Sequence, residues 1–511
     1  MSFHSILYSN RSDRMAGAQI KRPDIFADLG LDQVVSAVIR GKDEYDLAEF
    51  FYAPLDDVKA VIYRQAAMQD IERPGLLVKL NAFARRLHDM RAQLAQMEKR
   101  YSASQRARWF LNTVVHYCDT ITRIDRDLQS ADIQSEAFVH IRDHVNSYAT
   151  SDRFAKLVDD SKDLTAALGA IRYNVLIQGL RVSIGEHQDE PDYGKEVEDT
   201  FAKFNTGLTK AYRFDHDLSV DVDPVESKIL ERVAALYDST FTKLELFYNA
   251  NQDFVDPAIA VFDREVQFYI SYLSYIAPLR KAGLRFCYPR VSNSDKSIRA
   301  VDSFDLALAT KLARDHAVPV CNDVRLNGAE RIIVVSGPNQ GGKTTFARTF
   351  GQLHYLGGLG CPVPASAAQL YLPDRVFTHF ERAERMSSLR GKLQDDLIRV
   401  HEILEAATPR SLIIINEIFS STTLKDAVFL SHKVADAIVT LDALCVWVTF
   451  IEEVSAWGEK TLSMVSAVDP DNADHRTFKI VRQPANGLAY AMSIARKYRL
   501  TRDAIMERIR A

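Results

Sequence analysis

One glycine-rich segment constrains the fold of this chain more than any other part of the sequence. Residues 337–344 read Gly-Pro-Asn-Gln-Gly-Gly-Lys-Thr, fit the pattern GxxxxGK[ST], and lie between an apolar run at 331–335 and a helical pattern that starts at Thr344. Glycines let successive backbone N–H groups turn inward toward an anion, and a helix N-terminus adds partial positive charge. The agreement of strand, loop and helix predicts a phosphate-binding loop.

The side chains of this loop predict its ligand. Lys343 is expected to reach the β- and γ-phosphates of a nucleotide, and the Thr344 hydroxyl is expected to ligate Mg²⁺. The predicted ligands are therefore ATP and Mg²⁺. The residues predicted to bind ATP are Gly337, Pro338, Asn339, Gln340, Gly341, Gly342, Lys343, Thr344 and Thr345.

A second apolar strand supplies the acidic group that ATP hydrolysis requires. Residues 412–415 are Leu-Ile-Ile-Ile, and Asn416 and Glu417 follow them. Glu417 is the predicted general base, and Asn416 is predicted to hold Mg²⁺ through a water molecule. Because Asn416 lacks the charge of an aspartate, weak Mg²⁺ retention and slow hydrolysis are expected. The alternative for Glu417 is an exposed carboxylate without a catalytic role.

The apolar pattern changes near residue 280. Residues from about 31 to 279 read as mostly helical, and the clearest helix covers 258–277, where apolar residues at helical spacing predict core packing. From 281 to 511, short apolar runs alternate with helical patterns. This alternation predicts a mainly parallel sheet covered by helices.

The charge distribution shows no overall basic balance. The formal net charge is −4, so any contact with nucleic acid requires a local patch. Residues 172–184 indicate a short strand pair, and the acidic run from Glu186 to Asp199 that follows opposes phosphate binding there. A small basic cluster surrounds Trp109, for which a solvated helix face is the preferred explanation. Its members are Lys99, Arg100, Arg106 and Arg108.

Cysteine usage and apolar runs bear on the cellular compartment. The five cysteines are scattered singly without a CxxC pair, which argues against a zinc ribbon or a disulfide framework and fits a reducing cytoplasm. The N-terminus lacks the apolar core of a signal peptide, and the longest apolar stretches, such as 443–449, are too short to span a bilayer. A cytoplasmic protein without a membrane partner is expected.

With these motifs in place, the sequence resembles the DNA mismatch repair MutS family, whose ATPases are related to the ABC class. Residues 335–345 resemble the family's TGPNMGGKST loop, and residues 362–365 and 374–378 lie where the family has VPA and DRIFTR segments. Residues 54–56, followed by Arg64 and Gln65, resemble the opening of the family's lever domain. Pro278 followed by Cys287-Tyr288-Pro289 resembles the return of the lever into the ATPase domain.

The resemblance implies a multidomain fold. A mostly α-helical lever and clamp region is expected at 1–280, with a clamp-like insertion at about 165–235. An α/β P-loop ATPase domain of the ABC type is expected at 281–511. Because the chain begins near the lever, it is expected to lack the family's N-terminal mismatch-binding and connector domains.

Gly391, Lys392 and Phe450 depart from the family pattern. Gly391 and Lys392 align with the family's Ser-Thr signature, so a contact in trans with the partner subunit's nucleotide is implied, with a solvated lysine as the equal alternative. Phe450 stands at the position of the family's switch histidine and cannot hydrogen-bond a γ-phosphate. Sensing of ATP is therefore expected to be altered.

The resemblance also implies a function. A homodimer is expected to couple ATP binding and slow hydrolysis to a conformational change that acts on structured or branched DNA rather than on mismatches, with other repair proteins as further partners. The alternative is an ATP-gated protein scaffold with little hydrolysis and no direct DNA binding. A chromosome-structure ATPase is disfavoured because no long heptad pattern occurs, and a transporter ATPase is disfavoured because no LSGGQ-type signature occurs.

Overall fold

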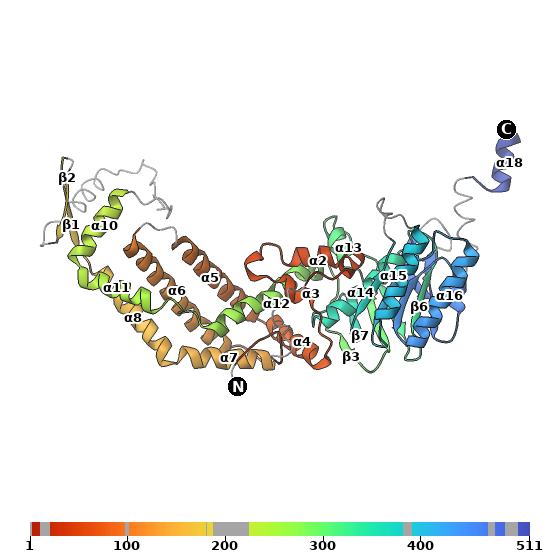
Figure 1. Cartoon of the computed structure of the whole chain (residues 1–511), viewed down its shortest axis with the longest axis horizontal. Coiled ribbons are helices and arrows are strands. Elements are labelled where there is room, and N and C mark those ends of the chain that lie inside the picture. Colours follow the sequence, from red (N-terminus) through yellow and green to blue (C-terminus); the bar gives the residue numbers. More distant parts are fainter. Residues whose placement is uncertain are drawn as a thin grey trace. The chain divides into compact units, whose positions relative to one another are not determined.

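The computed structural model describes residues 3–10, 21–97, 102–179, 181–187, 224–381, 391–468, 476–485 and 499–510. The chain divides into two compact units (Figure 1). The first comprises Met1–Phe3, Arg73–Ile133 and Val139–Asp263, and the second comprises His4–Glu72, Gln134–Phe138 and Arg264–Ala511. This division follows spatial contact, so the N-terminal helices belong to the same unit as the sheets. The change from helices to alternating strands and helices lies near residue 280, after α12 and before β3.

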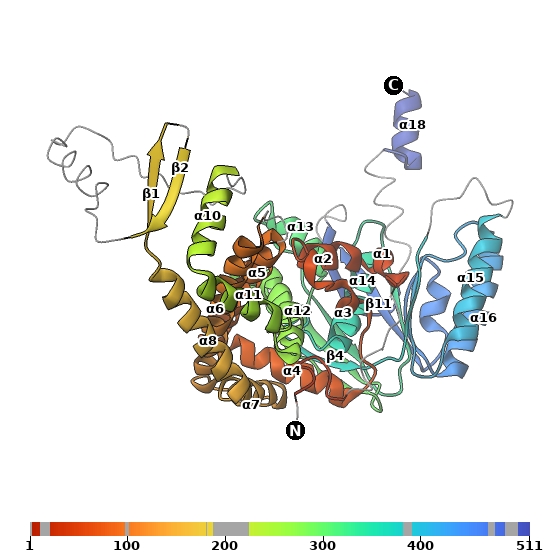
Figure 2. The same ribbon diagram turned by 60° about the vertical axis from the view of Figure 1, so that its left-hand side comes forward.

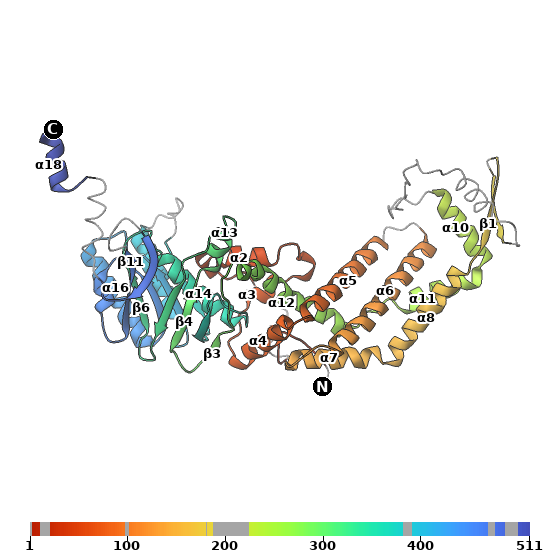
Figure 3. The same cartoon turned by 180° about the vertical axis from the view of Figure 1, so that it is seen from behind.

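The first unit is built from long helices. They are α5 (Leu76–Met97), α6 (Ala103–Gln129), most of α7 (Glu136–Ala149), α8 (Asp152–Gly169), α10 (Pro224–Leu236) and α11 (Asp238–Ala250). Helices α5 and α6 run side by side (Figure 3). The buried ring of Phe110 on α6 meets Phe247 and Phe254 edge-on, with centroid distances of 6.2 and 5.4 Å. Such aromatic contacts stabilise the unit because large apolar rings are removed from water.

The predicted strand pair in this unit is confirmed. Strands β1 (Tyr173–Gln178) and β2 (Arg181–Glu186) are antiparallel, and Ile177 faces Val182. The acidic run beyond His187 lies outside the described residues, as do Lys99 and Arg100 of the predicted basic cluster.

Helix α12 (Pro257–Lys281) confirms the clearest helical prediction. Phe262, Val266 and Tyr269 on its apolar stripe are fully buried, and Pro278 lies within its last turn. Among the described residues, none of the helices combines the length and apolar character that crossing a lipid bilayer requires.

Two sheets organise the second unit. The six-stranded sheet has the order β12-β11-β6-β10-β9-β8, and the four-stranded sheet has the order β3-β7-β4-β5. In the larger sheet, β8, β9, β10, β6 and β11 are parallel to their neighbours and β12 is antiparallel to β11, which confirms the mainly parallel sheet. The strands are β3 (Arg290–Ser292), β4 (Ile298–Ser303), β5 (Asn322–Leu326), β6 (Ile332–Ser336), β7 (Ala367–Tyr371), β8 (Val376–His379), β9 (Leu412–Asn416), β10 (Leu444–Val448), β11 (Thr461–Val468) and β12 (Arg476–Arg482).

Helices from both the N-terminal and the C-terminal parts of the chain accompany these sheets. They are α1 (Ile25–Leu29), α2 (Leu31–Val38), η2 (Asp43–Tyr45), α3 (Ala48–Tyr52), α4 (Val58–Glu72), α13 (Leu306–Ala313), α14 (Lys343–Gly358), α15 (Lys392–Ala406), α16 (Leu424–Leu441), η3 (Glu452–Ala456) and α18 (Arg502–Arg510).

Helices cover both faces of the six-stranded sheet. Strands β6, β9 and β10 are buried along their whole length, which explains why they read as continuous apolar runs. Ile413 of β9 belongs to the same buried cluster as Ile438 of α16, and α15 lies beside α16 (Figure 2). The side chain of Ile414 points to the opposite face of the sheet, toward α14. A Cβ added at Gly351 of α14 would lie 2.7 Å from the Cδ1 of Ile414. The helix after the glycine-rich loop is thereby held close to the sheet.

Candidate nucleotide-binding site

The glycine-rich loop joins the central strand β6 to the first turn of α14. Gly337, Gln340 and Gly342 have positive φ angles of 119°, 61° and 92°, so the backbone curls back on itself. Gly342 is the N-cap of α14, and no side chain caps this helix end. The backbone N–H groups of the first turn are therefore suited to an external anion.

A neighbouring strand packs closely on this loop. The Ser466 hydroxyl of β11 donates a 2.7 Å hydrogen bond to the carbonyl oxygen of Gly341. A Cβ at Gly341 would lie 2.3 Å from the Ser466 Oγ, and one at Gly337 would lie 3.0 Å from its Cβ. Glycine is thus required by the approach of β11 as well as by the curvature of the loop. Sequence reasoning missed Ser466, because no local motif marks it.

Lys343 is buried within the loop. Its Nζ donates hydrogen bonds to the carbonyl oxygen of Gly337 at 2.8 Å and to the Asn339 Oδ1 at 3.3 Å, and it lies 3.9 Å from the Glu417 Oε1. Burial lowers the pKa of Lys343, the Glu417 carboxylate opposes this change, and Arg476 on β12 lowers the pKa further. The ammonium group therefore lies where it can bind a phosphate and is also close to the predicted base.

The predicted metal and base residues meet at the end of β9. The Thr344 hydroxyl donates a 2.9 Å hydrogen bond to the Asn416 Oδ1, and Asn416 is the last residue of that strand. Glu417 follows with a φ of 53°, and its backbone N–H donates to the Val448 carbonyl oxygen at 2.9 Å. A non-glycine residue in the left-handed region is strained, and such strain clusters at functional sites.

A cavity of about 660 Å³ connects these groups to an apolar wall. The loop residues 339–345 and Glu417 line its polar end. Its apolar end is lined by Leu308, Leu312, Val318, Pro319, Val320 and Phe478. An apolar wall beside a phosphate loop suits a flat nucleotide base. The sequence alone could not identify this wall, because its residues come from α13, the segment before β5, and β12.

One side chain fixes the position of Phe478 in this wall. The Asn322 Nδ2 donates to the Phe478 carbonyl oxygen at 3.1 Å, and the Ile480 N–H donates to the Asn322 Oδ1 at 2.8 Å. Both polar atoms of the Asn322 amide therefore bind the backbone of β12. Phe478 itself has a φ of 56°, a second strained position at the cavity.

Comparisons with known proteins match the part of the chain that contains this site. The family model for MutS domain V matches residues 333–508, from β6 to α18. This part of the chain is therefore similar to domain V of the MutS family.

Individual MutS-family proteins are similar to it over part of their length. The DNA mismatch repair protein MutS of Orientia tsutsugamushi (strain Boryong) is 27% identical over 215 residues, which are 41% of this chain and 24% of that protein. The DNA mismatch repair protein msh3 of Aspergillus terreus is 28% identical over 287 residues, which are 55% of this chain and 24% of that protein. The msh3 of Emericella nidulans is 33% identical over 151 residues, or 29% of this chain and 14% of that protein. The chain thus spans at most about a quarter of the length of these relatives.

The positions that depart from the MutS pattern lie outside the cavity lining. Gly391 is the N-cap of α15, and Lys392 in the first turn forms an ion pair with Glu381. Phe450 follows β10 and is 49% exposed. Within the described part of the chain, neither Lys392 nor Phe450 is brought to the predicted phosphate site of its own subunit.

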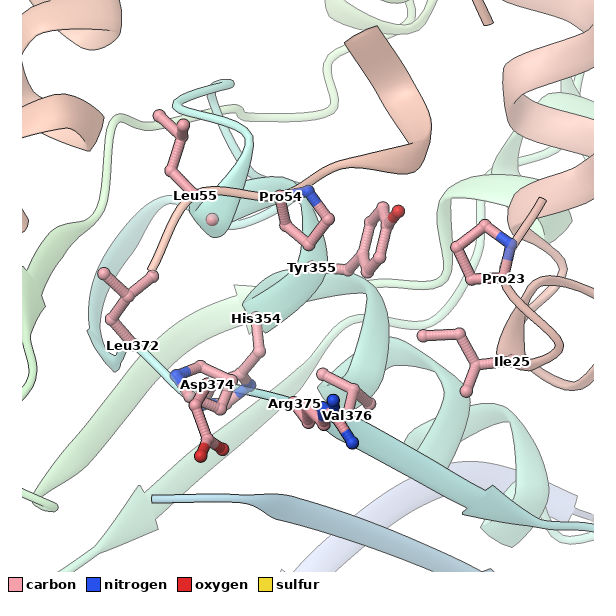
Figure 4. A pocket seen from close by; sticks show the side chains of 12 residues that line it. Pro23, Ile25, Pro54, Leu55, His354, Tyr355, Leu372, Asp374, Arg375 and Val376 are labelled. Atoms are coloured by element: carbon pink, nitrogen blue, oxygen red, sulfur yellow. The ribbon is translucent and has the colours of Figure 1, made fainter. Parts of the chain in front are cut away.

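A second, smaller pocket joins two segments that resemble MutS motifs. Its volume is about 180 Å³, and Figure 4 shows Pro54 and Leu55 opposite the segment 372–376, with His354 and Tyr355 projecting from α14. The start of the expected lever and the DRVFT segment therefore pack against the same helix.

One nitrogen of His354 and the carboxylate of Asp374 form hydrogen bonds within the protein, whereas the buried Nε2 of His354 has no hydrogen-bond partner among the described residues. The Nδ1 of His354 bonds the Phe350 carbonyl oxygen at 2.8 Å, and burial lowers the pKa of His354 to about 4. Asp374 accepts hydrogen bonds from Thr408 at 2.6 Å and Ser411 at 2.9 Å. A neutral histidine and a satisfied carboxylate indicate a role in packing for this pocket.

Proposed function

We propose that this chain binds ATP with Mg²⁺ in the larger cavity and hydrolyses the ATP slowly. The convergence of Lys343, Thr344 and Glu417 on one cavity carries the proposal. The uncapped N-terminus of α14 supports phosphate binding, and the apolar wall that includes Val320 and Phe478 supports binding of the base.

In the proposed reaction, Glu417 orients the attacking water and accepts its proton. Its backbone is fixed by the bond to Val448, and the Lys343 ammonium lies 3.9 Å from its carboxylate. Mg²⁺, when bound, would neutralise phosphate charge. The neutral oxygens of Thr344 and Asn416 fit such a cation, with Asn416 acting through water. Because an amide replaces a charged carboxylate at residue 416, slow turnover is expected.

We further infer that ATP binding drives a conformational change of a homodimer that acts on DNA. The MutS-family relatives are named as DNA mismatch repair proteins, which supports DNA as the partner. One phosphate loop leaves one side of the γ-phosphate open, and a second subunit could close that side and exclude water. We assign Gly391 and Lys392 to this trans contact, the lever to 1–280 with a clamp-like insertion at about 165–235, and the ATPase domain to 281–511. Other repair proteins are further proposed partners.

An ATP-gated protein scaffold with little hydrolysis is the second candidate. The exposure of Phe450, which lies outside the cavity lining, favours it, because a switch residue that cannot meet the γ-phosphate would weaken the link between ATP and turnover.

The rate of ATP hydrolysis with and without single-stranded, duplex and four-way DNA distinguishes the two candidates. The first predicts a slow rate that at least one DNA structure changes, and DNA affinity that falls steeply with salt. A rate indifferent to all three DNA structures, together with no salt-dependent binding, would favour the scaffold.

A further inference from the structure

The four-stranded sheet carries a row of arginines across its exposed face. Arg290 of β3 pairs laterally with Gln369 of β7, Gln369 pairs with Arg299 of β4, and Arg299 pairs with Arg325 of β5. Laterally paired residues point to the same face of a sheet. We call Arg290, Arg299 and Arg325 the arginine row.

The two faces of this sheet differ sharply. All three members of the arginine row are exposed, whereas Ala300 and Val324, which pair on the opposite face, are buried. The inner face packs toward α14, where Leu370 of β7 approaches Gly357. The arginine row is therefore a feature of the solvent face.

The row is electrostatically unfavourable by itself. Arg299 and Arg325 lie directly opposite each other, and like charges in this position destabilise a sheet. Within the described ranges, neither of them forms an ion pair or a side-chain hydrogen bond. A bound anion would remove the repulsion.

Asp323 on β5 and Asp295 after β3 are two carboxylates close to the row in the chain. Asp323 accepts a 2.8 Å hydrogen bond from the backbone N–H of Asp302. Asp295 accepts hydrogen bonds from the N–H of Ser297 at 2.9 Å and from the Nε2 of Gln369 at 3.4 Å. The bond from Ser297, together with the charge of Arg290, lowers the pKa of Asp295. Among the described residues, Arg299 and Arg325 form no ion pair with either of these carboxylates.

We propose that the arginine row binds the phosphate backbone of DNA. Three inter-strand spacings separate its ends, about 14 Å, which matches about four nucleotides of one DNA strand. The planar guanidinium fork suits phosphate oxygens, and an exposed sheet face suits an extended polyanion. This inference rests on the proposed function for the choice of DNA as partner, and it adds a contact surface on the ATP-binding unit.

The test measures binding of a labelled duplex to the full chain across a range of salt concentrations. Replacing all three arginines with glutamine should raise the Kd at least about tenfold at low salt and reduce the slope of log affinity against log salt by about two to three. The matched control replaces Arg40, Lys59 and Lys425, which are exposed cations of the same unit outside this sheet, with glutamine. A triple arginine-to-lysine variant should keep most of the slope, and ATP binding measured for each variant reports on its folding.

The possible outcomes separate the two proposals. If the unmodified chain binds no DNA at low salt, the DNA part of the proposed function fails, and this inference fails with it. If the unmodified chain binds DNA and the glutamine variant binds equally well, or no worse than the control variant, only the arginine row is excluded. Poly-glutamate serves as a probe for an acidic protein partner. If the glutamine variant loses binding to poly-glutamate while its DNA binding is unchanged, the proposal is overturned, because the partner would then be an acidic protein.

Discussion

The Thr344 hydroxyl donates a 2.9 Å hydrogen bond to the amide oxygen of Asn416. This bond links the first turn of the helix after the glycine-rich loop to the end of the strand that positions Glu417. The proposed metal ligand is thereby linked to the residue that directly precedes the proposed base.

Replacing Asn416 with aspartate should strengthen Mg²⁺ binding. A charged acceptor adds about 1–2 kcal/mol over a neutral one, so the Mg²⁺ concentration for half-maximal ATP binding should fall roughly tenfold. Titration of Mg²⁺ at fixed ATP measures this. The variant Thr344→Val should move the midpoint in the opposite direction, and an unchanged midpoint in Asn416→Asp would rule out a role for residue 416 at the metal.

Replacing Glu417 with alanine should separate ATP binding from hydrolysis. General base catalysis contributes about 100- to 10,000-fold, so hydrolysis should fall by that order while ATP still binds. Lys343→Ala should instead abolish binding, because it removes the cation at the phosphates. Equilibrium binding and single-turnover hydrolysis of both variants provide the comparison. Undiminished hydrolysis in Glu417→Ala would exclude this residue as the base.

Replacing Gly341 with alanine should prevent ATP binding through a clash with β11. The added Cβ would lie 2.3 Å from the Ser466 Oγ. The double variant with Ser466→Gly should recover part of the affinity, since the clashing side chain is gone. Ser466→Ala alone should cost only about 1 kcal/mol, the worth of one hydrogen bond. If the Gly341→Ala variant and the double variant lose the same amount of ATP affinity, contact with Ser466 of β11 is not the reason that residue 341 must be glycine.

Replacing Phe478 with alanine should weaken ATP binding without affecting binding of inorganic triphosphate. Stacking of a base on an aromatic ring is worth about 1–3 kcal/mol, so the affinity for ATP should fall roughly tenfold or more. Asn322→Ala should show a smaller effect in the same direction, because Asn322 anchors the backbone of Phe478. A parallel loss of triphosphate affinity would show that Phe478 supports the loop rather than the base.

The stability of the second unit should depend on the protonation of His354. Burial lowers its folded pKa to about 4, below the ordinary 6.5, so the unfolded chain binds the proton first as the pH falls. The contribution of neutral, buried His354 to the free energy of unfolding is complete above about pH 6.5, and it is lost as the pH falls toward 4. Linkage gives about 2 kcal/mol of lost stability between pH 7.5 and 5.

The variant His354→Asn provides the control for this effect, since its amide can still donate to the Phe350 carbonyl oxygen. Urea unfolding of the chain and the variant at both pH values measures the difference. If the variant shows the same pH dependence as the unmodified chain, the group that titrates lies elsewhere.

Local patterns were sufficient to predict the glycine-rich loop between β6 and α14 and the buried strand that ends at Asn416. The loop needs glycines at fixed spacing, and the buried strands need unbroken apolar runs, so both leave a direct trace in the sequence. The stripe on α12 was predictable for the same reason, since helical periodicity reports burial of one face.

Other contacts could not be predicted in this way because they join distant segments. Arg64 is fully buried, and its Nε donates to the Leu7 carbonyl oxygen at 2.8 Å, while Gln65 donates to the Pro289 carbonyl oxygen at 3.0 Å. An arginine in a helical pattern ordinarily indicates a solvated face. Arg64 is buried instead because the N-terminal segment packs against α4.

By itself, the sequence determined the glycine-rich loop between a buried strand and a helix and the carboxylate that follows the neighbouring strand, because these depend on backbone conformation within a few consecutive residues. The tertiary structure decided that Ser466 contacts the loop, that Phe478 lines the apolar wall of the cavity and that three arginines form a row. These features depend on strand order and register, which bring together residues that are far apart along the chain.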